Sequence, residues 1–153
     1  MLHLVLYQPE IPPNTGNIIR LCANTGVILH LIHPLGFKLD DKKLRRAGLD
    51  YDEFAQVREY SSLDEFREQN DSLRIFAIST RGKTSYADTR FQDDDAFIMG
   101  PETRGLPQGL LDSFADDRVL RIPMKQESRS LNLSNAAAII VYEAWRQMHF
   151  NGI

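Results

Sequence analysis

Short hydrophobic runs, each followed by a polar or glycine-containing segment, divide the chain into alternating expected strands and helices. Continuous apolar runs at 73–79 and 96–99 are typical of strands buried on both faces of a parallel sheet. Strands that alternate with helices predict an α/β fold, with a mostly parallel sheet and helices on both faces. The other expected extended segments are 2–7, 27–33, 54–60 and 119–122, and the expected helices are 14–25, 41–47, 62–70, a short one from Pro107, and 132–148.

Polar caps and glycines mark the ends of these helices. Asn14 is expected to cap the first helix and Gly26 to end it, as a polar start and a glycine end usually do. Ser62 and Glu65 have the spacing of a capping box at the start of a helix. Gly48 is expected to close the helix at 41–47.

The last expected helix is apolar on more than one side, because Ala138, Ile139 and Tyr142 lie outside its main stripe. Such a helix needs two packing partners, of which one is its own sheet. The second is either another part of the chain or another subunit. The main stripe follows the i, i+3, i+4, i+7 pattern and consists of Leu133, Ala136, Ala137, Ile140, Val141, Ala144, Trp145 and Met148.

Length and composition indicate one globular domain over residues 1–153, with 42% hydrophobic and 25% charged residues. Cys22 is the only cysteine, so the chain forms no internal disulfide. No apolar run approaches the ~20 residues of a membrane span, and Met1 leads directly into an expected strand instead of a signal peptide. We therefore expect a cytoplasmic protein with no membrane association. No metal site is expected either, because the histidines lack metal-ligand spacing: His3, His30, His33 and His149.

The net charge of −3 argues weakly against broad nucleic-acid binding, but the positive charges are clustered. A local patch can bind phosphates on an acidic protein, because salt screens distant charges. For the first cluster taken alone, an ordinary solvated helix face is the better explanation. The clustered residues are Lys42, Lys43, Arg45 and Arg46, followed by Arg81, Lys83 and Arg90.

Three segments carry residues that a simple scaffold does not require. In the first, N-T-G-N-I-I-R at 14–20, the side chains of Asn14, Asn17, Arg20 and Asn24 are expected along one side of a helix. They form either a solvent-facing stripe or a recognition surface, and asparagine is a poor choice for the former.

The second segment, I-M-G-P-E-T-R-G-L-P at 98–107, leaves a buried strand and holds Glu102 and Arg104 between two glycines. Ligands bind at the carboxyl ends of strands in open α/β sheets. The glycine spacing fits neither a P-loop nor a dinucleotide fingerprint.

The third segment combines R-I-P-M at 121–124 with S-R-S-L-N-L-S-N at 128–135. Its serines and asparagines place hydroxyl and amide groups at the start of the last expected helix. Helix capping explains only one of these residues, Asn132.

Together these three segments, in this order, resemble the motifs of the SPOUT superfamily of RNA methyltransferases. The whole chain is similar to the small single-domain tRNA (cytidine/uridine-34-2′-O)-methyltransferases, with slight departures at Arg81 and Leu131. The resemblance implies a C-terminal trefoil knot, a homodimer and S-adenosylmethionine as cofactor. It also implies methylation of the wobble 2′-hydroxyl in the anticodon stem-loop of tRNA, with leucine isoacceptors as substrates.

The resemblance also implies roles for particular residues. Arg20, Glu102, Asn14 and Asn132 would be catalytic. Because arginine is always protonated, we expect Arg20 to stabilise the forming alkoxide and to bind the adjacent phosphate. Glu102 is expected to orient Arg20 through a charge-assisted bond, either within the chain or across the dimer interface. The cofactor-binding residues would be Ile78, Ser79, Gly100, Glu102, Gly105, Ile122, Met124, Ser130 and Leu131.

Three other functions are compatible with parts of the sequence. One is a 2′-O-methyltransferase of another tRNA position or of rRNA, because the motifs define the reaction better than the substrate. Another is a non-catalytic RNA- or cofactor-binding module, although Arg20 and the serine–asparagine loop are both present. A flavodoxin-like nucleotide-binding module would leave that loop unexplained.

Overall fold

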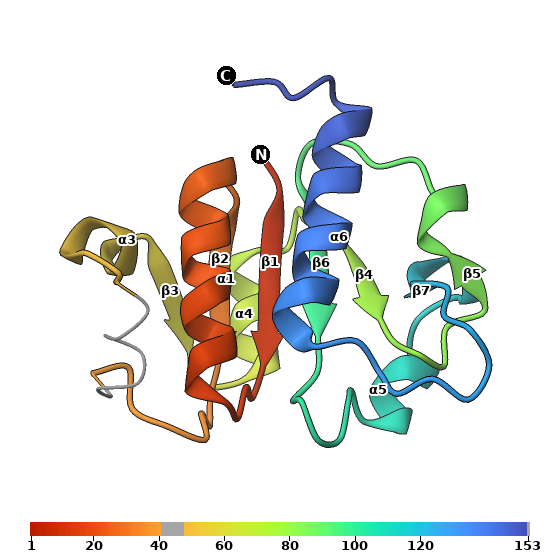
Figure 1. Cartoon of the computed structure of the whole chain (residues 1–153), viewed down its shortest axis with the longest axis horizontal. Coiled ribbons are helices and arrows are strands. Elements are labelled where there is room, and N and C mark those ends of the chain that lie inside the picture. Colours follow the sequence, from red (N-terminus) through yellow and green to blue (C-terminus); the bar gives the residue numbers. More distant parts are fainter. Residues whose placement is uncertain (41–47, 153) are drawn as a thin grey trace.

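A computed structural model describes residues 1–40 and 48–152 (Figure 1). In this part of the chain, seven parallel strands form one sheet in the order β3-β2-β1-β6-β4-β7-β5. The strands are β1 His3–Tyr7, β2 Ile28–Ile32, β3 Val57–Tyr60, β4 Arg74–Ile78, β5 Thr84–Ser85, β6 Asp95–Met99 and β7 Val119–Arg121. The helices are α1 Pro12–Thr25, α3 Tyr51–Ala55, α4 Leu63–Gln69, α5 Gln108–Asp112 and α6 Leu133–Gln147, with 3₁₀ turns at Tyr86–Asp88 and Asp116–Arg118.

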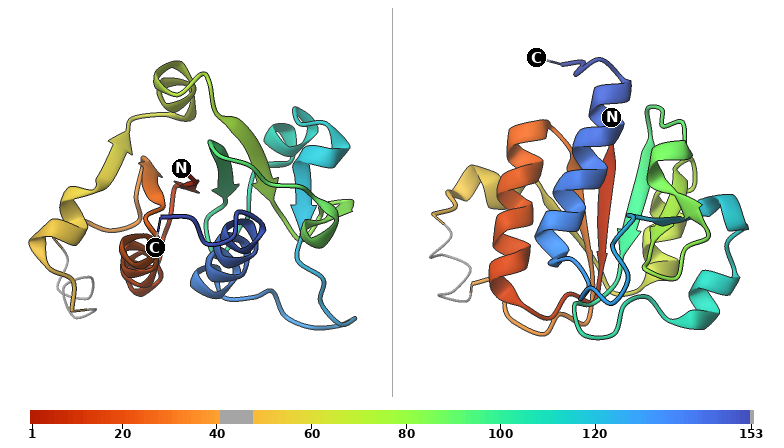
Figure 2. Two further views of the ribbon diagram at one scale, coloured as in Figure 1. Left: turned by 90° about the horizontal axis from the view of Figure 1, so that it is seen from above. Right: turned by 45° about the vertical axis from the view of Figure 1, so that its right-hand side comes forward.

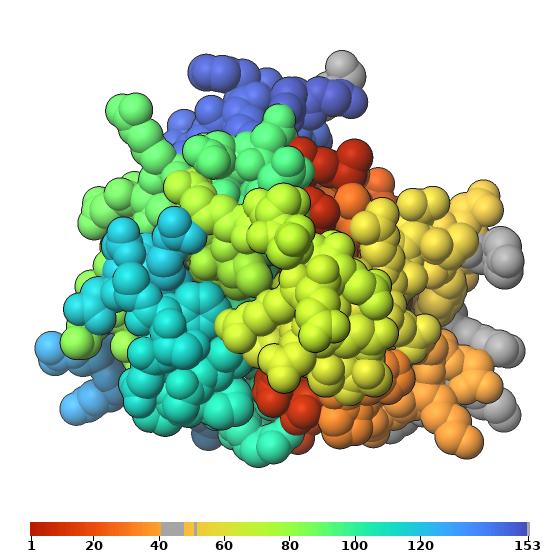
Figure 3. All heavy atoms as spheres, turned by 180° about the vertical axis from the view of Figure 1, so that it is seen from behind, coloured from red at the N-terminus to blue at the C-terminus, as the bar shows by residue number. Residues whose placement is uncertain are grey.

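Helices cover both faces of the sheet, as the alternating pattern predicts. The long helices α1 and α6 lie side by side on one face (Figure 2), and α4 and α5 lie on the opposite face (Figure 3). Successive strand residues point to opposite faces. In β1, Leu4 and Leu6 therefore join the core beneath α1 and α6, while Val5 joins the core beneath α4 and α5. The main stripe of α6 is confirmed by the burial of Ala136, Ala137, Ile140, Val141 and Ala144.

The first helix starts earlier than the sequence suggests. It begins at Pro12, and its N-cap Ile11 makes no side-chain capping bond, so the prediction that Asn14 caps it is wrong. Proline is well suited to the first helical positions because its φ is preset and its missing N–H would have no helical partner there. Gly26 ends the helix with φ +74°, as predicted.

Two later boundaries follow the capping signals. Ser62 accepts a hydrogen bond from the N–H of Glu65, and Asn132 accepts one from the N–H of Ser134. The extended segment expected at 54–60 is only half right. Asp50 caps a short helix over Tyr51–Ala55, and the strand begins at Val57. This helix is too short to show a 3.6-residue hydrophobic period, so the sequence pattern did not reveal it.

Some predictions fall outside the described residues. The helix expected at 41–47 lies there, together with Lys42, Lys43, Arg45 and Arg46 of the basic cluster. Within residues 1–40 and 48–152, no helix has the length and apolar character to cross a membrane.

A buried polar chain links three strands under the α4 layer. The Nδ1 of His3 lies 2.9 Å from the Nε2 of His30, and the Nδ1 of His30 lies 2.9 Å from the hydroxyl of Tyr60. His30 is fully buried and His3 nearly so. Burial lowers the pKa of both imidazoles, that of His30 to about 3. Both rings are therefore neutral in the folded protein at neutral pH.

This network predicts a loss of stability in acid. Because the folded-state pKa of His30 lies below the unfolded value of 6.5, the stability is complete above about pH 6.5 and falls as the pH drops towards 3. His30 should lower the free energy of unfolding, measured with urea, by about 1–2 kcal/mol at about pH 5 relative to about pH 7.5.

A His30→Gln variant should lose part of that pH dependence, whereas His149→Asn, at an exposed site with positive φ, should keep all of it. An unchanged pH dependence in the His30 variant, measured at the same protein concentration, would contradict the assignment.

Candidate active site

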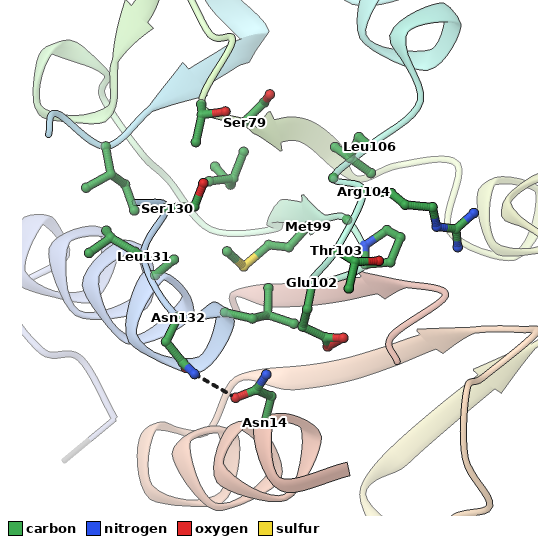
Figure 4. A pocket seen from close by; sticks show the side chains of 18 of the residues that line it. Asn14, Ser79, Met99, Glu102, Thr103, Arg104, Leu106, Ser130, Leu131 and Asn132 are labelled. Atoms are coloured by element: carbon green, nitrogen blue, oxygen red, sulfur yellow. Dashed lines mark hydrogen bonds between the residues drawn. The ribbon is translucent and has the colours of Figure 1, made fainter. Parts of the chain in front are cut away.

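A cavity of about 470 Å³ opens at the carboxyl ends of β4, β6 and β7, beside the start of α6. Because β6, β4 and β7 are neighbours in a parallel sheet, the loops that follow them meet at one edge. The sequence segments 78–81, 99–106, 122–124 and 130–133 all contribute to its wall (Figure 4). All the residues expected to bind the cofactor line this cavity, as do Asn14 and Asn132.

The cavity wall is apolar on one part and polar on another. Met99 and Leu106 add to the apolar part, and Thr80 and Thr103 add to the polar part. None of these four was among the predicted site residues. They lie on the same loops as the selected residues, so including whole loops would have found them. Arg81, which was not among the predicted site residues, holds the wall in place by donating to the Leu106 carbonyl at 2.5 Å and to the Gln108 side chain at 2.6 Å.

Two glutamates join the loop after β1 to the loop after β6. The Oε2 of Glu102 accepts hydrogen bonds from the backbone N–H groups of Glu10, at 2.8 Å, and Ile11, at 3.0 Å. In return, the Oε1 of Glu10 accepts bonds from the N–H and the hydroxyl of Thr103 at 3.0 and 2.7 Å. These bonds from Thr103 lower the pKa of Glu10. Both carboxylates thus fix one loop against the other, and we refer to this pair as the glutamate clasp.

The second oxygen of Glu102 makes no hydrogen bond with the described residues. This atom, Oε1, is buried. A buried acceptor without a partner costs free energy, of the order of 1–3 kcal/mol. A donor bound in the cavity would remove that cost.

Asn132 joins the two helices that flank the cavity. Its Nδ2 donates to the Oδ1 of buried Asn14 at 3.0 Å, while its own Oδ1 caps α6 (Figure 4). The side chain of Asn14 is therefore used for this contact between α1 and α6 and not for capping α1. In the part of the chain that the structure describes, no group of His, Cys, Asp and Glu is arranged to hold a metal ion.

Gly100 is required by the packing of its own loop. A Cβ there would lie 2.8 Å from the Cα of Gly105 and closer still to the next peptide group. Gly105 has φ +66° and donates to the carbonyl of Pro101 at 2.8 Å, which closes the turn. The missing side chain of Gly100 thus has a reason inside the protein.

Arg20 lies outside this cavity. Its Nε donates to the Oε2 of Glu53 and its Nη2 to the carbonyl of Gly48, both at 2.6 Å. Within the chain it does not bond to Glu102, so the expectation that Glu102 orients Arg20 fails inside one chain. Asn14 is buried, but Arg20 is exposed, so they do not share one side of α1 as expected. Asn14 and Arg20 are six residues apart, so their side chains point in directions ~120° apart around the helix axis. Each step of three or four residues along the series is small, and the accumulated rotation is easily missed.

Comparison with known proteins gives consistent matches over nearly the whole chain. A model of the SpoU rRNA Methylase family matches residues 1–142. The chain is 55% identical over 152 residues to the tRNA (cytidine(34)-2′-O)-methyltransferase of Escherichia coli (strain K12), which covers 99% of this chain and 97% of that protein. A structure described as "Structural insights into the 2-OH methylation of C/U34 on tRNA" is similar with a TM-score of 0.90 and 49% identity, covering 97% of each chain.

A more distant structure carries a cofactor. The SpoU methyltransferase AviRb from Streptomyces viridochromogenes, in complex with the cofactor AdoMet, is similar with a TM-score of 0.83 and 25% identity. The similarity covers 97% of this chain and 58% of that one.

The packing of Gly100 predicts a strong effect of a single methyl group. Gly100→Ala should lower the free energy of unfolding by about 1–3 kcal/mol, because the loop must move to accept the Cβ. Gly109→Ala is the matched control, since a Cβ at Gly109 meets nothing within 4 Å and alanine favours the helix. Thermal unfolding of both variants checks this, and equal stability of the two would contradict it.

Proposed function

Since this chain belongs to the SpoU rRNA methylase family, we propose that it is an S-adenosylmethionine-dependent methyltransferase that modifies a ribose 2′-hydroxyl of tRNA. It acts as one domain over residues 1–153, and its target is the wobble nucleotide, cytidine or uridine 34, in the anticodon stem-loop of leucine isoacceptors. The observation that carries the proposal is the convergence of all the expected cofactor residues in one cavity. The 55% identity to a tRNA (cytidine(34)-2′-O)-methyltransferase supports the choice of substrate.

The residues of the cavity suit S-adenosylmethionine. Ile78, Ile122 and Met124 offer apolar surfaces to an adenine, and Ser79 and Ser130 offer hydroxyl groups. The partnerless Oε1 of Glu102 can accept a bond from a ligand donor, such as an ammonium group. When bound, the cofactor supplies a methyl group already activated on a sulfonium. We infer that no metal takes part.

The remaining work falls to side chains of the protein, which align the hydroxyl and stabilise its developing charge. Arg20 is a fixed positive charge with several N–H donors, so it stabilises the forming alkoxide and binds the neighbouring phosphate. The hydroxyl proton leaves to that phosphate or to water. Asn14, Asn132 and the glutamate clasp hold the wall on which the ribose is placed.

Because Arg20 lies outside the cavity of its own chain, we assign its catalytic contact to the cavity of a second copy in a homodimer. Exposed apolar surface on α6 supports this assembly. Tyr142 is 45% exposed and stacks edge-to-face on Trp145, and Ile139 is only partly buried. The adjacent helix α1 carries Arg20, so a contact through this layer brings Arg20 of one copy towards the other. Light scattering tests the dimer, and a monomer would contradict it.

We also propose that the C-terminal part forms a trefoil knot. After β7 the chain runs along the loops that follow β4 and β6 before it reaches α6 on the other side of the cavity. The backbone there is tightly packed, since a Cβ at Gly82 would lie 2.7 Å from the carbonyl carbon of Leu120.

The function predicts a defined product. Purified protein with S-adenosylmethionine and tRNA, in the presence of a chelator, should methylate the 2′-hydroxyl of nucleotide 34, which mass spectrometry of the digested tRNA locates. Methylation at another position, or only of rRNA, would contradict the proposed substrate.

The cofactor site is checked by calorimetry with S-adenosylhomocysteine alone. The absence of any heat of binding to the folded protein would contradict the proposed cofactor site.

The role of Arg20 predicts a loss of rate rather than of binding. Arg20→Ala and Arg20→Lys should both fold and bind the cofactor, but lose single-turnover methyl transfer by about 10²-fold or more at saturating cofactor and tRNA. Lysine should be a poor substitute because it lacks the planar fork of arginine. A lysine variant within a few-fold of the parent that gains on it as the pH rises would show that Arg20 acts instead as a base.

A further inference from the structure

Two groups outside the cavity hold the guanidinium of Arg20 from one side. The Glu53 carboxylate accepts from Nε and the Gly48 carbonyl accepts from Nη2, each at 2.6 Å. The Glu53 side chain is only 16% exposed, whereas that of Arg20 is 44% exposed. The arginine is therefore anchored on its buried side and open to solvent on the other. We call Gly48 and Glu53 the arginine cradle.

The local sequence builds this cradle. Gly48 has φ +73°, a left-handed conformation that glycine adopts without strain, and its carbonyl reaches Arg20. Asp50 caps α3 by accepting from the N–H of Glu53 at 2.9 Å, which fixes the position of Glu53 in the first turn. In a capping box a glutamate at this position returns to the cap residue. Here the Glu53 carboxylate bonds to Arg20 instead.

The cradle leaves the reactive side of the guanidinium available. Arginine has five N–H donors in a rigid plane. One on Nε and one on Nη2 are used, so both donors of Nη1 and the second donor of Nη2 have no partner in the cradle. One donor of Nη1 and the second donor of Nη2 lie side by side at the end of the plane, where they suit two oxygens of a phosphate, and the other donor of Nη1 lies on the edge away from the cradle.

We propose that Glu53 is the positioning residue of Arg20: through the cradle it fixes the plane of the guanidinium so that the remaining donors meet the ribose and phosphate of the substrate. This inference rests on the proposed catalytic role of Arg20. It replaces the expected role of Glu102 within the chain, because Glu102 is engaged in the glutamate clasp. The opposite role, in which Glu53 withholds Arg20 from the substrate, predicts the opposite change in rate.

A double-mutant cycle tests the proposal on the full-length protein. Single-turnover methyl transfer is measured at saturating cofactor and tRNA for the parent, Glu53→Ala, Arg20→Ala and the double variant. Glu53→Ala should lose about 10-fold in rate, because a misplaced charge loses much of its effect, with less than about twofold change in half-saturation by tRNA. Glu53→Gln should lose less, since its amide oxygen can still accept from Nε.

Two controls separate positioning from a general effect on the fold. Asp52→Ala removes an exposed carboxylate of the same helix turn that is not part of the cradle, and it should keep the parental rate. In the Arg20→Ala background, Glu53→Ala should change the rate by less than about twofold, because the group that it positions is absent.

Each other outcome has a distinct meaning. An equal loss from Glu53→Ala in both backgrounds would show a merely structural role and overturn the proposal. A faster Glu53→Ala variant would show that Glu53 withholds Arg20, and a parental rate would show that the cradle is not needed. A parental rate in Arg20→Ala alone would instead overturn the proposed catalytic role of Arg20.

Discussion

Parallel pairing of β6, β4 and β7 is the constraint on which the candidate site depends. Adjacent parallel strands end at the same edge of a sheet, so three loops that are distant in sequence share one wall. The two helical layers keep these strands buried on both faces, and the burial of β6 and β4 follows from their continuous apolar runs. The position of the cavity is thus a consequence of sheet topology, and its chemistry is a consequence of the loops.

Hydrogen bonds between loops turn this edge into a defined cavity. The glutamate clasp ties the loop after β1 to the loop after β6, and Asn14 with Asn132 ties α1 to α6. The bonds from Glu10 N–H to Glu102 and from Asn132 to Asn14 are part-buried, whereas those made by Thr103 are exposed. Among the described atoms of this group, Oε1 of Glu102 is left without a hydrogen-bond partner.

Arg20, the proposed catalytic residue, is separated from this cavity. Arg20 is held by the cradle on the outer side of α1, where a second copy of the chain can receive it. Under the proposed division of the site between two copies, activity depends on assembly, because neither the cavity nor Arg20 is sufficient alone. It also explains why Glu53, which contacts no part of the cavity, is assigned to the reaction.

The sequence by itself determined much of the fold. Apolar runs and caps located most strands, the C-terminal end of α1 and both ends of α6, and three motifs supplied most residues of the cavity wall. These features are local, since burial on two faces and capping are written in short stretches of sequence. Helix α3 and strand β5 were too short for any period to be recognised.

Only the tertiary structure decided the partners of the polar side chains. Asn14 carries the residue type of a helix cap, yet it bonds to Asn132, and Glu102 bonds to the backbone of Glu10 and Ile11 instead of to Arg20. Glu53 gave no signal in the sequence because its partner lies 33 positions away. A hydrogen bond depends on distance and angle between two groups, and for residues far apart in the chain these are set by packing and not by spacing.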